Sequence, residues 1–299
     1  MPTRMRLDRT VLSGWLVAVA VTLAVISSAR AQETPIEIEV ITSGPASLNT
    51  NFTLIMAADD AVLVDVPFLR SDAYRLVADI LDTGRTLRTI VVTHAHPDHY
   101  FGLDVVTEAF PEAEVIAAAP VVDEIWKRFP KRLAYWKPKI GLNAPRYPYI
   151  PERLEEDSFE FHGHDIEILG PMQGDTGVST ALHIPDLNAV IAGDLVFNQV
   201  HVYTGDHTKI QRQAWLESLD ELAALEPEIV VAGHKKPDLA NTPEGLEFTR
   251  RYLVRFEKAV GEAANAKELI AVMRAAFPNA IDFQGDFILT TSAQNAFAE

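Results

Sequence analysis

A short stretch in the first half of the chain concentrates side chains that bind metal ions. His94, His96, Asp98 and His99 lie within six consecutive positions. Imidazole and carboxylate groups are ligands that a borderline cation such as zinc accepts, and a tight turn can direct alternate side chains at one point. A solvated, histidine-rich turn is the alternative. We favour a metal site because a β-branched run typical of a buried strand precedes the cluster and a helical pattern follows it.

The cluster resembles the first diagnostic motif of the metallo-β-lactamase superfamily, His-x-His-x-Asp-His. The resemblance extends over essentially the whole chain after its first 31 residues. It implies an α/β fold, the four-layer αβ/βα sandwich, in which two β-sheets pack face to face, helices lie outside and the metals lie at one edge of the sheets. By this resemblance His94 and His96 would bind a first metal, and Asp98 and His99 a second. Asp98 would also orient the attacking water or protonate the leaving group.

Three later residues would complete the site by the same resemblance. Asp194 ends a predicted strand at the position where the family has a carboxylate that bridges both metals. His234 follows a glycine at the end of another predicted strand and matches the family's final ligand. Asp175 is a departure, because the family normally has a histidine there. We interpret it as an oxygen ligand of the first metal, and a turn residue beside a weak or missing site is the alternative. The implied cofactor is zinc, as one or two ions, with iron or manganese as alternatives.

Two further residues are weaker candidates for support of the ligands or contact with substrate. Asp65, at the end of a predicted strand, resembles the acidic residue that the family has behind its metals, where it would accept a hydrogen bond from a ligand histidine. A simple turn carboxylate is an equal alternative. His201 lies close in sequence to Asp194 and is the second candidate. Phe101 is a small departure from the glycine pair that many members have after the motif, and it would reshape the wall of the cleft.

The periodicity of apolar residues predicts alternating strands and helices that would position these side chains. An opening antiparallel meander is expected at 36–41, 52–56 and 61–66. Residues 137–151 contain four prolines and are predicted to form a structured loop. No repeat or linker interrupts the pattern, so we expect one domain over 32–299. Further strands are predicted at 87–93, 114–118, 158–161, 165–169, 180–184, 189–192 and 228–232, and helices at 72–81, 99–110, 121–136, 215–223 and 242–256.

The N-terminus has the layout of a secretory signal peptide. Three arginines precede an apolar run at 11–28, and Ala29-Arg30-Ala31 offers a small-x-small cleavage site. We therefore predict that 1–31 is a cleaved leader and that the protein is exported, either periplasmic or secreted. A retained membrane anchor is the alternative, because the apolar run approaches the length of a bilayer span. After cleavage we expect no stable membrane partner, and the sequence indicates no particular oligomeric state.

Net charge and the absence of cysteine exclude some classes of function. The chain has 299 residues, a formal charge of −16 and no cysteine. Nucleic acid is not expected as a partner, because phosphate binding requires a basic surface. Absence of cysteine excludes disulfides and thiolate ligands. The segment 126–149 stands out as basic and aromatic. It is either a lid or wall for an apolar ester or lactone that could carry a carboxylate, or an amphipathic helix with core aromatics.

The resemblance implies a metallo-hydrolase whose metal activates water against a small-molecule substrate. We expect an ester, a lactone or a related carbonyl bond to be cleaved. Three alternatives remain open. They are a β-lactam hydrolase of the type without cysteine, a mono-iron oxidative enzyme with two histidines and an aspartate, and a non-catalytic metal-binding protein that kept the fold.

Overall fold

The computed structural model describes residues 34–283 and 285–298. The predicted leader at 1–31 lies outside the described residues, so its cleavage and the export of the protein stay predictions. Within the described ranges, no helix combines the length and the apolar character that a membrane span requires.

The first half of the described chain forms a six-stranded sheet whose strands follow one another in chain order. The first three strands pair antiparallel, which confirms the predicted opening meander. The next three are added by parallel pairing, and parallel strands require long crossover connections. The strands are β1 (Ile36–Thr42), β2 (Asn51–Ala57), β3 (Asp60–Val64), β4 (Thr86–Val91), β5 (Glu114–Ala118) and β6 (Glu152–Leu154).

The second half forms a five-stranded sheet with the order β11-β10-β9-β8-β7. Four strands make an antiparallel meander, and the last joins β10 in parallel. A hydrogen bond from Thr180 N to Thr93 O, at 3.0 Å, joins the start of β9 to the segment that follows β4. The strands are β7 (Ser158–Phe161), β8 (His164–Met172), β9 (Ser179–Ile184), β10 (Ala189–Asn198) and β11 (Ile229–Lys235).

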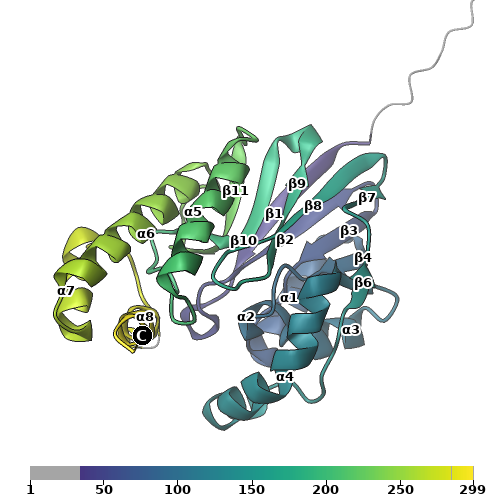
Figure 1. The fold of residues 1–299 in the computed structure, drawn as a ribbon. Helices are drawn as coiled ribbons and strands as arrows, with labels where there is room; N and C mark the ends of the chain where they lie inside the picture. The colour runs from purple at the N-terminus through teal and green to yellow at the C-terminus, as the bar shows by residue number, and fades with distance from the viewer. Residues whose placement is uncertain (1–33, 284, 299) are drawn as a thin grey trace, which may run out of the picture. The chain divides into compact units, whose positions relative to one another are not determined.

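Helices cover the outer face of each sheet (Figure 1). Three pack on the first sheet and three on the second, each against a cluster of buried apolar side chains. Two further helices contribute residues to the site. α2 (Pro97–Tyr100) contains the second half of the histidine motif, and α8 (Phe287–Ala296) is the last helix. The covering helices are α1 (Arg70–Asp82), α3 (Leu103–Ala109) and α4 (Ala119–Ile140), then α5 (Lys209–Ala223), α6 (Glu244–Glu262) and α7 (Ala266–Ala276).

A third apolar cluster fills the space between the two sheets. Successive residues of a strand point to opposite faces, so Leu54 and Leu63 face the helices while Ile55 and Val62 face the other sheet. Ile191 meets them from the second sheet. Three apolar layers thus separate four layers of secondary structure, and the predicted αβ/βα sandwich is confirmed.

The segment that follows β5 differs from the prediction. Helix α4 continues to Ile140 and contains Pro130 and Pro138, whereas a loop was expected from residue 137. Trp136 is buried against Phe68, with ring centroids 5.0 Å apart, and this packing stabilises the last turns despite the missing backbone donors. Phe129 is also buried, but Trp126 is 71% exposed. The segment is therefore an amphipathic helix that also provides one wall of a pocket described below.

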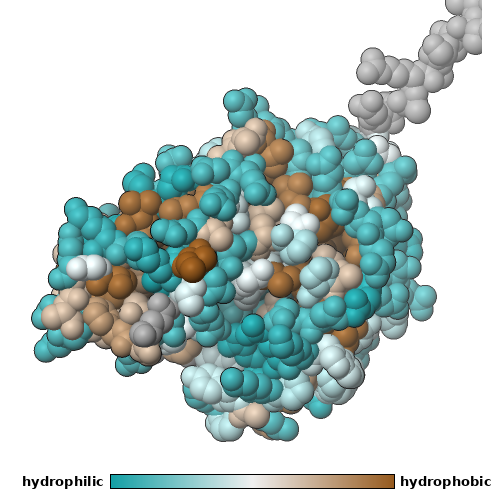
Figure 2. Space-filling view, viewed as in Figure 1, coloured by the Kyte–Doolittle hydropathy of each residue, from teal (hydrophilic) through white to brown (hydrophobic). Residues whose placement is uncertain are grey.

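Hydrophilic side chains dominate the molecular face drawn in Figure 2, and hydrophobic side chains appear there as scattered spots. This agrees with the 42 acidic and 26 basic residues of the chain. The sandwich thus places most of its apolar residues inside and leaves a hydrophilic exterior on this face.

Candidate metal centre

The seven predicted donor residues lie together at one edge of the sandwich, and both sheets contribute. His94 and His96 occupy the turn after β4, and Asp98 and His99 lie in α2. These four belong to the first sheet and its crossover. The second sheet contributes three residues: Asp175 from the β8–β9 turn, Asp194 from β10 and His234 from β11.

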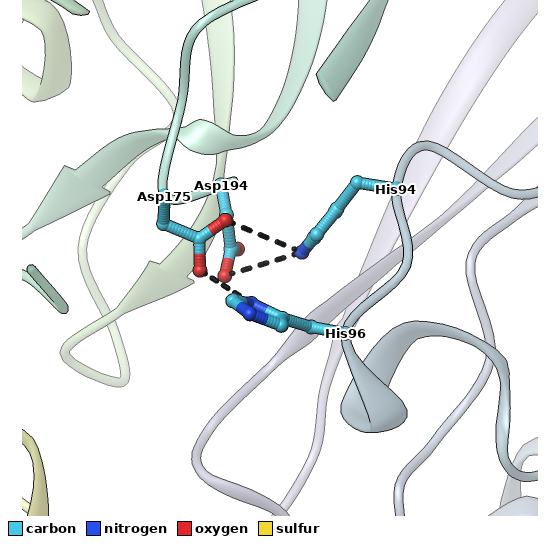
Figure 3. A group of neighbouring side chains, drawn as sticks. All are labelled: His94, His96, Asp175 and Asp194. Carbon is cyan, nitrogen blue, oxygen red and sulfur yellow. Dashed lines mark hydrogen bonds and ion pairs between the residues drawn. The ribbon is translucent and has the colours of Figure 1, made fainter. Parts of the chain in front are cut away.

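The first donor set consists of His94, His96, Asp175 and Asp194. All four are buried, and one donor atom of each lies within 4.8 Å of the others. Figure 3 shows the four side chains pointing toward one another, with Asp175 and Asp194 facing His94 and His96. His94 Nε2 lies 3.5 Å from Asp175 Oδ1 and 3.6 Å from Asp194 Oδ2, and His96 Nδ1 lies 2.6 Å from Asp175 Oδ2. Asp175 therefore stands in the donor set where the resemblance placed a ligand.

The second donor set consists of Asp98, His99 and His234, which are also buried and within the same mutual distance. His234 Nε2 lies 3.3 Å from Asp98 Oδ2. Asp194 adjoins this set too, because its Oδ1 is 3.2 Å from His99 Nε2 and its Oδ2 is 3.2 Å from His234 Nε2. A single carboxylate thus lies between the two sets.

Hydrogen bonds at the second ring nitrogen fix the orientation and tautomer of three histidines. Asp65 Oδ2 lies 2.7 Å from His99 Nδ1 and accepts a hydrogen bond from the Thr93 hydroxyl at 2.7 Å. Since that hydroxyl donates to Asp65, it accepts a hydrogen bond from His94 Nδ1, which is 3.0 Å away. The Leu48 carbonyl, 2.8 Å from His234 Nδ1, can only accept, so that nitrogen carries the hydrogen. Each of these rings therefore presents an unprotonated Nε2 to the centre whenever the ring is neutral.

Asp65 occupies this position through an unusual backbone. Its φ of 62° lies in the left-handed region, which a non-glycine residue rarely adopts. The Asp65 N–H donates to Val91 O at 2.9 Å, and its Oδ1 accepts from Thr93 N at 2.8 Å. The turn after β3 thus brings the carboxylate behind the ligand histidines, at the place that the resemblance implied.

Electrostatics inside the cluster favour positive charge between the carboxylates. Burial lowers the pKa of His94 and of His96 to about 3, so both rings are neutral at pH 7. Burial also disfavours charge on His234, but the Asp194 carboxylate outweighs it and raises the pKa to about 10. Burial together with the neighbouring Asp194 raises the pKa of Asp175 well above its usual range. Negative charge is thus crowded here, and a divalent cation would relieve the repulsion.

Several buried donor atoms lack a well-aligned hydrogen-bond partner within the described part of the chain, as expected of atoms that would bind a metal. Buried polar atoms are almost always hydrogen-bonded. Yet four atoms that face the centre make no well-aligned hydrogen bond to the described residues. They are the Nε2 atoms of His94 and His99 and the Oδ1 atoms of Asp175 and Asp194. Nitrogen and oxygen donors without cysteine suit zinc, manganese or iron.

Two glycines allow the strands to approach closely at this edge. An added Cβ at Gly233 would lie 1.9 Å from Asp194 Oδ1 and 2.6 Å from Gly193 C. Gly193 has a φ of 49°, and a Cβ there would lie 2.8 Å from Thr93 Oγ1. Larger residues would therefore displace Asp194 or the Thr93 hydroxyl from its place beside the donors.

A pocket opens onto the donor residues. His96, Asp98 and Asp194 lie in its floor, and most of the other lining residues are apolar. Arg132 and Tyr203 are the polar exceptions away from the donors. Sequence reasoning missed Tyr203, which belongs to no motif, whereas Arg132 lies in the basic, aromatic segment 126–149 that was a candidate wall for the substrate. The apolar lining consists of Leu48, Phe68, Pro97, Trp136, Phe197, Phe283, Phe287 and Ile288.

His201 does not join the cluster. It is buried with its Nδ1 2.9 Å from the Tyr252 hydroxyl of α6, and it lines no part of the pocket. β10 continues to Asn198 and carries the chain away from Asp194 before His201 is reached. The structure thus places His201 in the helix-facing core. Phe101 is buried as well and packs on Phe68, behind the pocket wall.

Comparison with known proteins identifies the family. Residues 47–234 match the model of the metallo-beta-lactamase superfamily. Since the match spans well over half of the chain, the protein belongs to this superfamily. A comparison with curated proteins gave no match.

Solved structures agree on the fold. A metallo-beta-lactamase family protein from Thermus thermophilus is 20% identical, with a TM-score of 0.60 over 88% of this chain and 91% of that one. DIM-1 metallo-beta-lactamase is 20% identical, with a TM-score of 0.56 over 74% and 97%. A metallo-beta-lactamase from Pontibacter korlensis is 15% identical, with a TM-score of 0.56 over 74% and 99%. At these identities the likeness shows the fold alone.

Proposed function

We propose that the protein is a hydrolase that binds two metal ions, zinc in the first place, and cleaves an ester, lactone or related carbonyl bond of a small molecule. The observation that supports this is the position of Asp194. Its carboxylate oxygens lie 3.2 Å from His99 Nε2 and 3.2 Å from His234 Nε2, and its Oδ2 is 3.6 Å from His94 Nε2. One buried carboxylate therefore reaches both donor sets and could bridge two cations.

The chemistry follows from what surrounds the donors. Metal ions at this site would lower the pKa of bound water and polarise a substrate carbonyl. Burial acts to raise the pKa of Asp98, but its contact with His234 holds that pKa well below the usual range. In the proposed reaction Asp98 would accept a hydrogen bond from the attacking water and could pass the proton that it receives to the leaving group. The apolar walls exclude bulk water, which strengthens each electrostatic interaction within.

Two other functions have partial support. His94, His96 and Asp175 alone would form the two-histidine, one-carboxylate set of mono-iron oxidative enzymes. The second donor set beside them favours the two-metal hydrolase instead. β-Lactams belong among the test substrates, because solved structures of similar fold are named metallo-beta-lactamases.

Metal content and turnover together test the proposal. We expect wild-type protein, purified without added metal, to contain about two zinc ions by mass spectrometry. Asp175→Ala should lose about one ion and reduce kcat/KM on the best ester, lactone or β-lactam by roughly 100-fold, at the upper end of what loss of a ligand's supporting partner does. Asp79→Ala, an exposed substitution on α1, is the control and should change neither.

One iron per chain in wild type would contradict the hydrolase. An unchanged metal count in Asp175→Ala would remove Asp175 from the site. Metal binding without turnover of any substrate class would contradict the hydrolase and favour a non-catalytic metal-binding protein.

A further inference from the structure

Two cavities lie side by side at the metal centre. The first is the apolar pocket whose floor contains the donor residues. A second cavity adjoins it, and Arg132, Trp136, Tyr203 and Phe287 line both. These four side chains therefore form the boundary between the two cavities.

Arg132 is held at this boundary by its neighbours. It lies one helical turn before Trp136 on α4, so the two side chains share a face of the helix. Its side chain is 22% exposed, and its Nη2 donates to Asp206 Oδ2 at 3.0 Å. A guanidinium has five N–H donors, so the bond to Asp206 orients the group and leaves other donors for a ligand.

The second cavity has a charge opposite to that of the molecule. Arg128, Lys131 and Arg132 line it together with one acid, Asp206, so its lining has a net charge of +2, and Arg128 is also paired with Glu124 on the same helix. The whole chain carries −16. A local positive field beside a site attracts anions.

Aromatic side chains line the donor pocket together with Arg132. The Trp136 ring lies 5.0 Å from that of Phe68 and 5.8 Å from that of Phe287. Tyr203 extends the wall to the donors, since its ring lies 5.7 Å from that of His96. An apolar group of a ligand would therefore lie between Arg132 and the metal ligands.

We infer that the substrate is amphipathic and carries an anionic group, of which a carboxylate is the simplest, bound by the Arg132 guanidinium, while its apolar part lies against Trp136 and Phe287 and its scissile bond faces the donor residues. The inference rests on the proposed hydrolase. Arg132 is then the residue that selects anionic substrates, because a planar fork binds a carboxylate with two parallel hydrogen bonds.

Paired substrates test the selectivity. Hydrolysis of 4-nitrophenyl hydrogen glutarate, which is anionic, is compared with that of neutral 4-nitrophenyl pentanoate. We expect wild type to prefer the anionic ester at least tenfold in kcat/KM, mainly through KM, and Arg132→Met to bring the ratio near one. Arg132→Lys should retain part of the preference, because it keeps the charge without the fork. Lys127→Met, an exposed residue of the same helix outside both cavities, should leave the ratio as in wild type.

Binding measurements separate this inference from the proposed function. Calorimetry with 4-phenylbutyrate and 4-phenylbutanamide, on wild type and Arg132→Met of equal metal content and melting temperature, reports anion selectivity without turnover. If no ester is cleaved but the carboxylate binds about tenfold more tightly only when Arg132 is present, the hydrolase fails and the anion site stands. Equal affinity for both probes in wild type, or a preference that persists in Arg132→Met, would overturn the inference.

Discussion

At the residue scale, Asp175 determines the balance of carboxylate and imidazole donors in the centre. A carboxylate stands where the family normally has an imidazole, so three carboxylates rather than two face the centre. Oxygen donors suit zinc, manganese and iron alike, whereas imidazole favours the later transition metals. The additional negative charge therefore widens the range of metals that the site can bind, and metal identity becomes a property to measure in this protein.

The Asp65 carboxylate, which lies behind the ligand histidines, should affect zinc affinity almost as much as the ligands do. Asp65→Asn removes the charge that faces His99 Nδ1 and weakens the acceptor that orients the Thr93 hydroxyl. We expect zinc affinity to fall by about 10- to 100-fold, the usual loss when such a partner is changed. Titration against a competing chelator measures it.

Asp104→Asn is the matched control for that substitution. Asp104 is also a buried aspartate, but it pairs with Arg70 and Arg146 and lies in no donor set. This variant should lose stability and keep its zinc affinity. Equal affinity in Asp65→Asn and wild type would show that the hydrogen bonds of Asp65 serve the fold alone.

The sequence predicted which seven side chains come together, because they follow one another in the order that the family motifs require. It could not predict the Leu48 carbonyl beside His234, since every residue has a carbonyl and only the fold selects one. Tyr203 was equally hidden, and for Arg132 the sequence indicated only the basic, aromatic segment to which it belongs. Arg132 reaches the pocket from α4 and Tyr203 from the segment after β10, and their meeting depends on tertiary packing.

At the element scale, the approach of β10 to β11 determines where Asp194 lies. Gly233→Ala would place a Cβ within 1.9 Å of Asp194 Oδ1, so the carboxylate or the strand must move. Overpacking of this kind costs about 1–3 kcal/mol. We expect Tm to fall by roughly 2–12 °C, at 2–4 °C per kcal/mol for a domain of this size, and zinc binding to weaken.

Gly261→Ala provides the comparison. This glycine lies in α6, and an added Cβ would meet nothing within 4 Å. Alanine is the better helix former, so this variant should be as stable as wild type or more stable. Thermal unfolding of both variants, with zinc bound, checks the pair. A Gly233→Ala protein that melts and binds zinc like wild type would mean that the strands can separate at this point without consequence.

Elements with a strong apolar period were predicted, and those that depend on tertiary contacts were not. β2 and β4 have many buried β-branched or aliphatic residues, and the prediction located both. α8 begins with Phe-Ile-Leu-Thr-Thr, a run typical of a strand, and becomes a helix where Ile288 and Leu289 pack into the second core. The end of α4 was missed because proline argues against a helix locally, while the burial of Trp136 outweighs it.

At the scale of the whole molecule, the donor residues connect the two halves of the sandwich. His94 and His96 follow the first sheet, and Asp194 and His234 belong to the second. Buried carboxylates repel one another across this junction, as the raised pKa of Asp175, caused by burial and then by Asp194, indicates. A metal bound there would replace that repulsion with bonds between the sheets.

Removal of metal should therefore lower the stability of the entire fold. A ligand present at about 100 times its Kd stabilises the native state by about 2.7 kcal/mol, which at 2–4 °C per kcal/mol corresponds to roughly 5–11 °C in Tm. We expect a chelator to lower Tm by this amount and added zinc to restore it, as measured by calorimetry. Asp194→Ala removes the carboxylate that both donor sets share, so its Tm should hardly respond to the chelator. If wild type lost its metal with no change in Tm, the two sheets would be held together without the site, and the metal would serve chemistry alone.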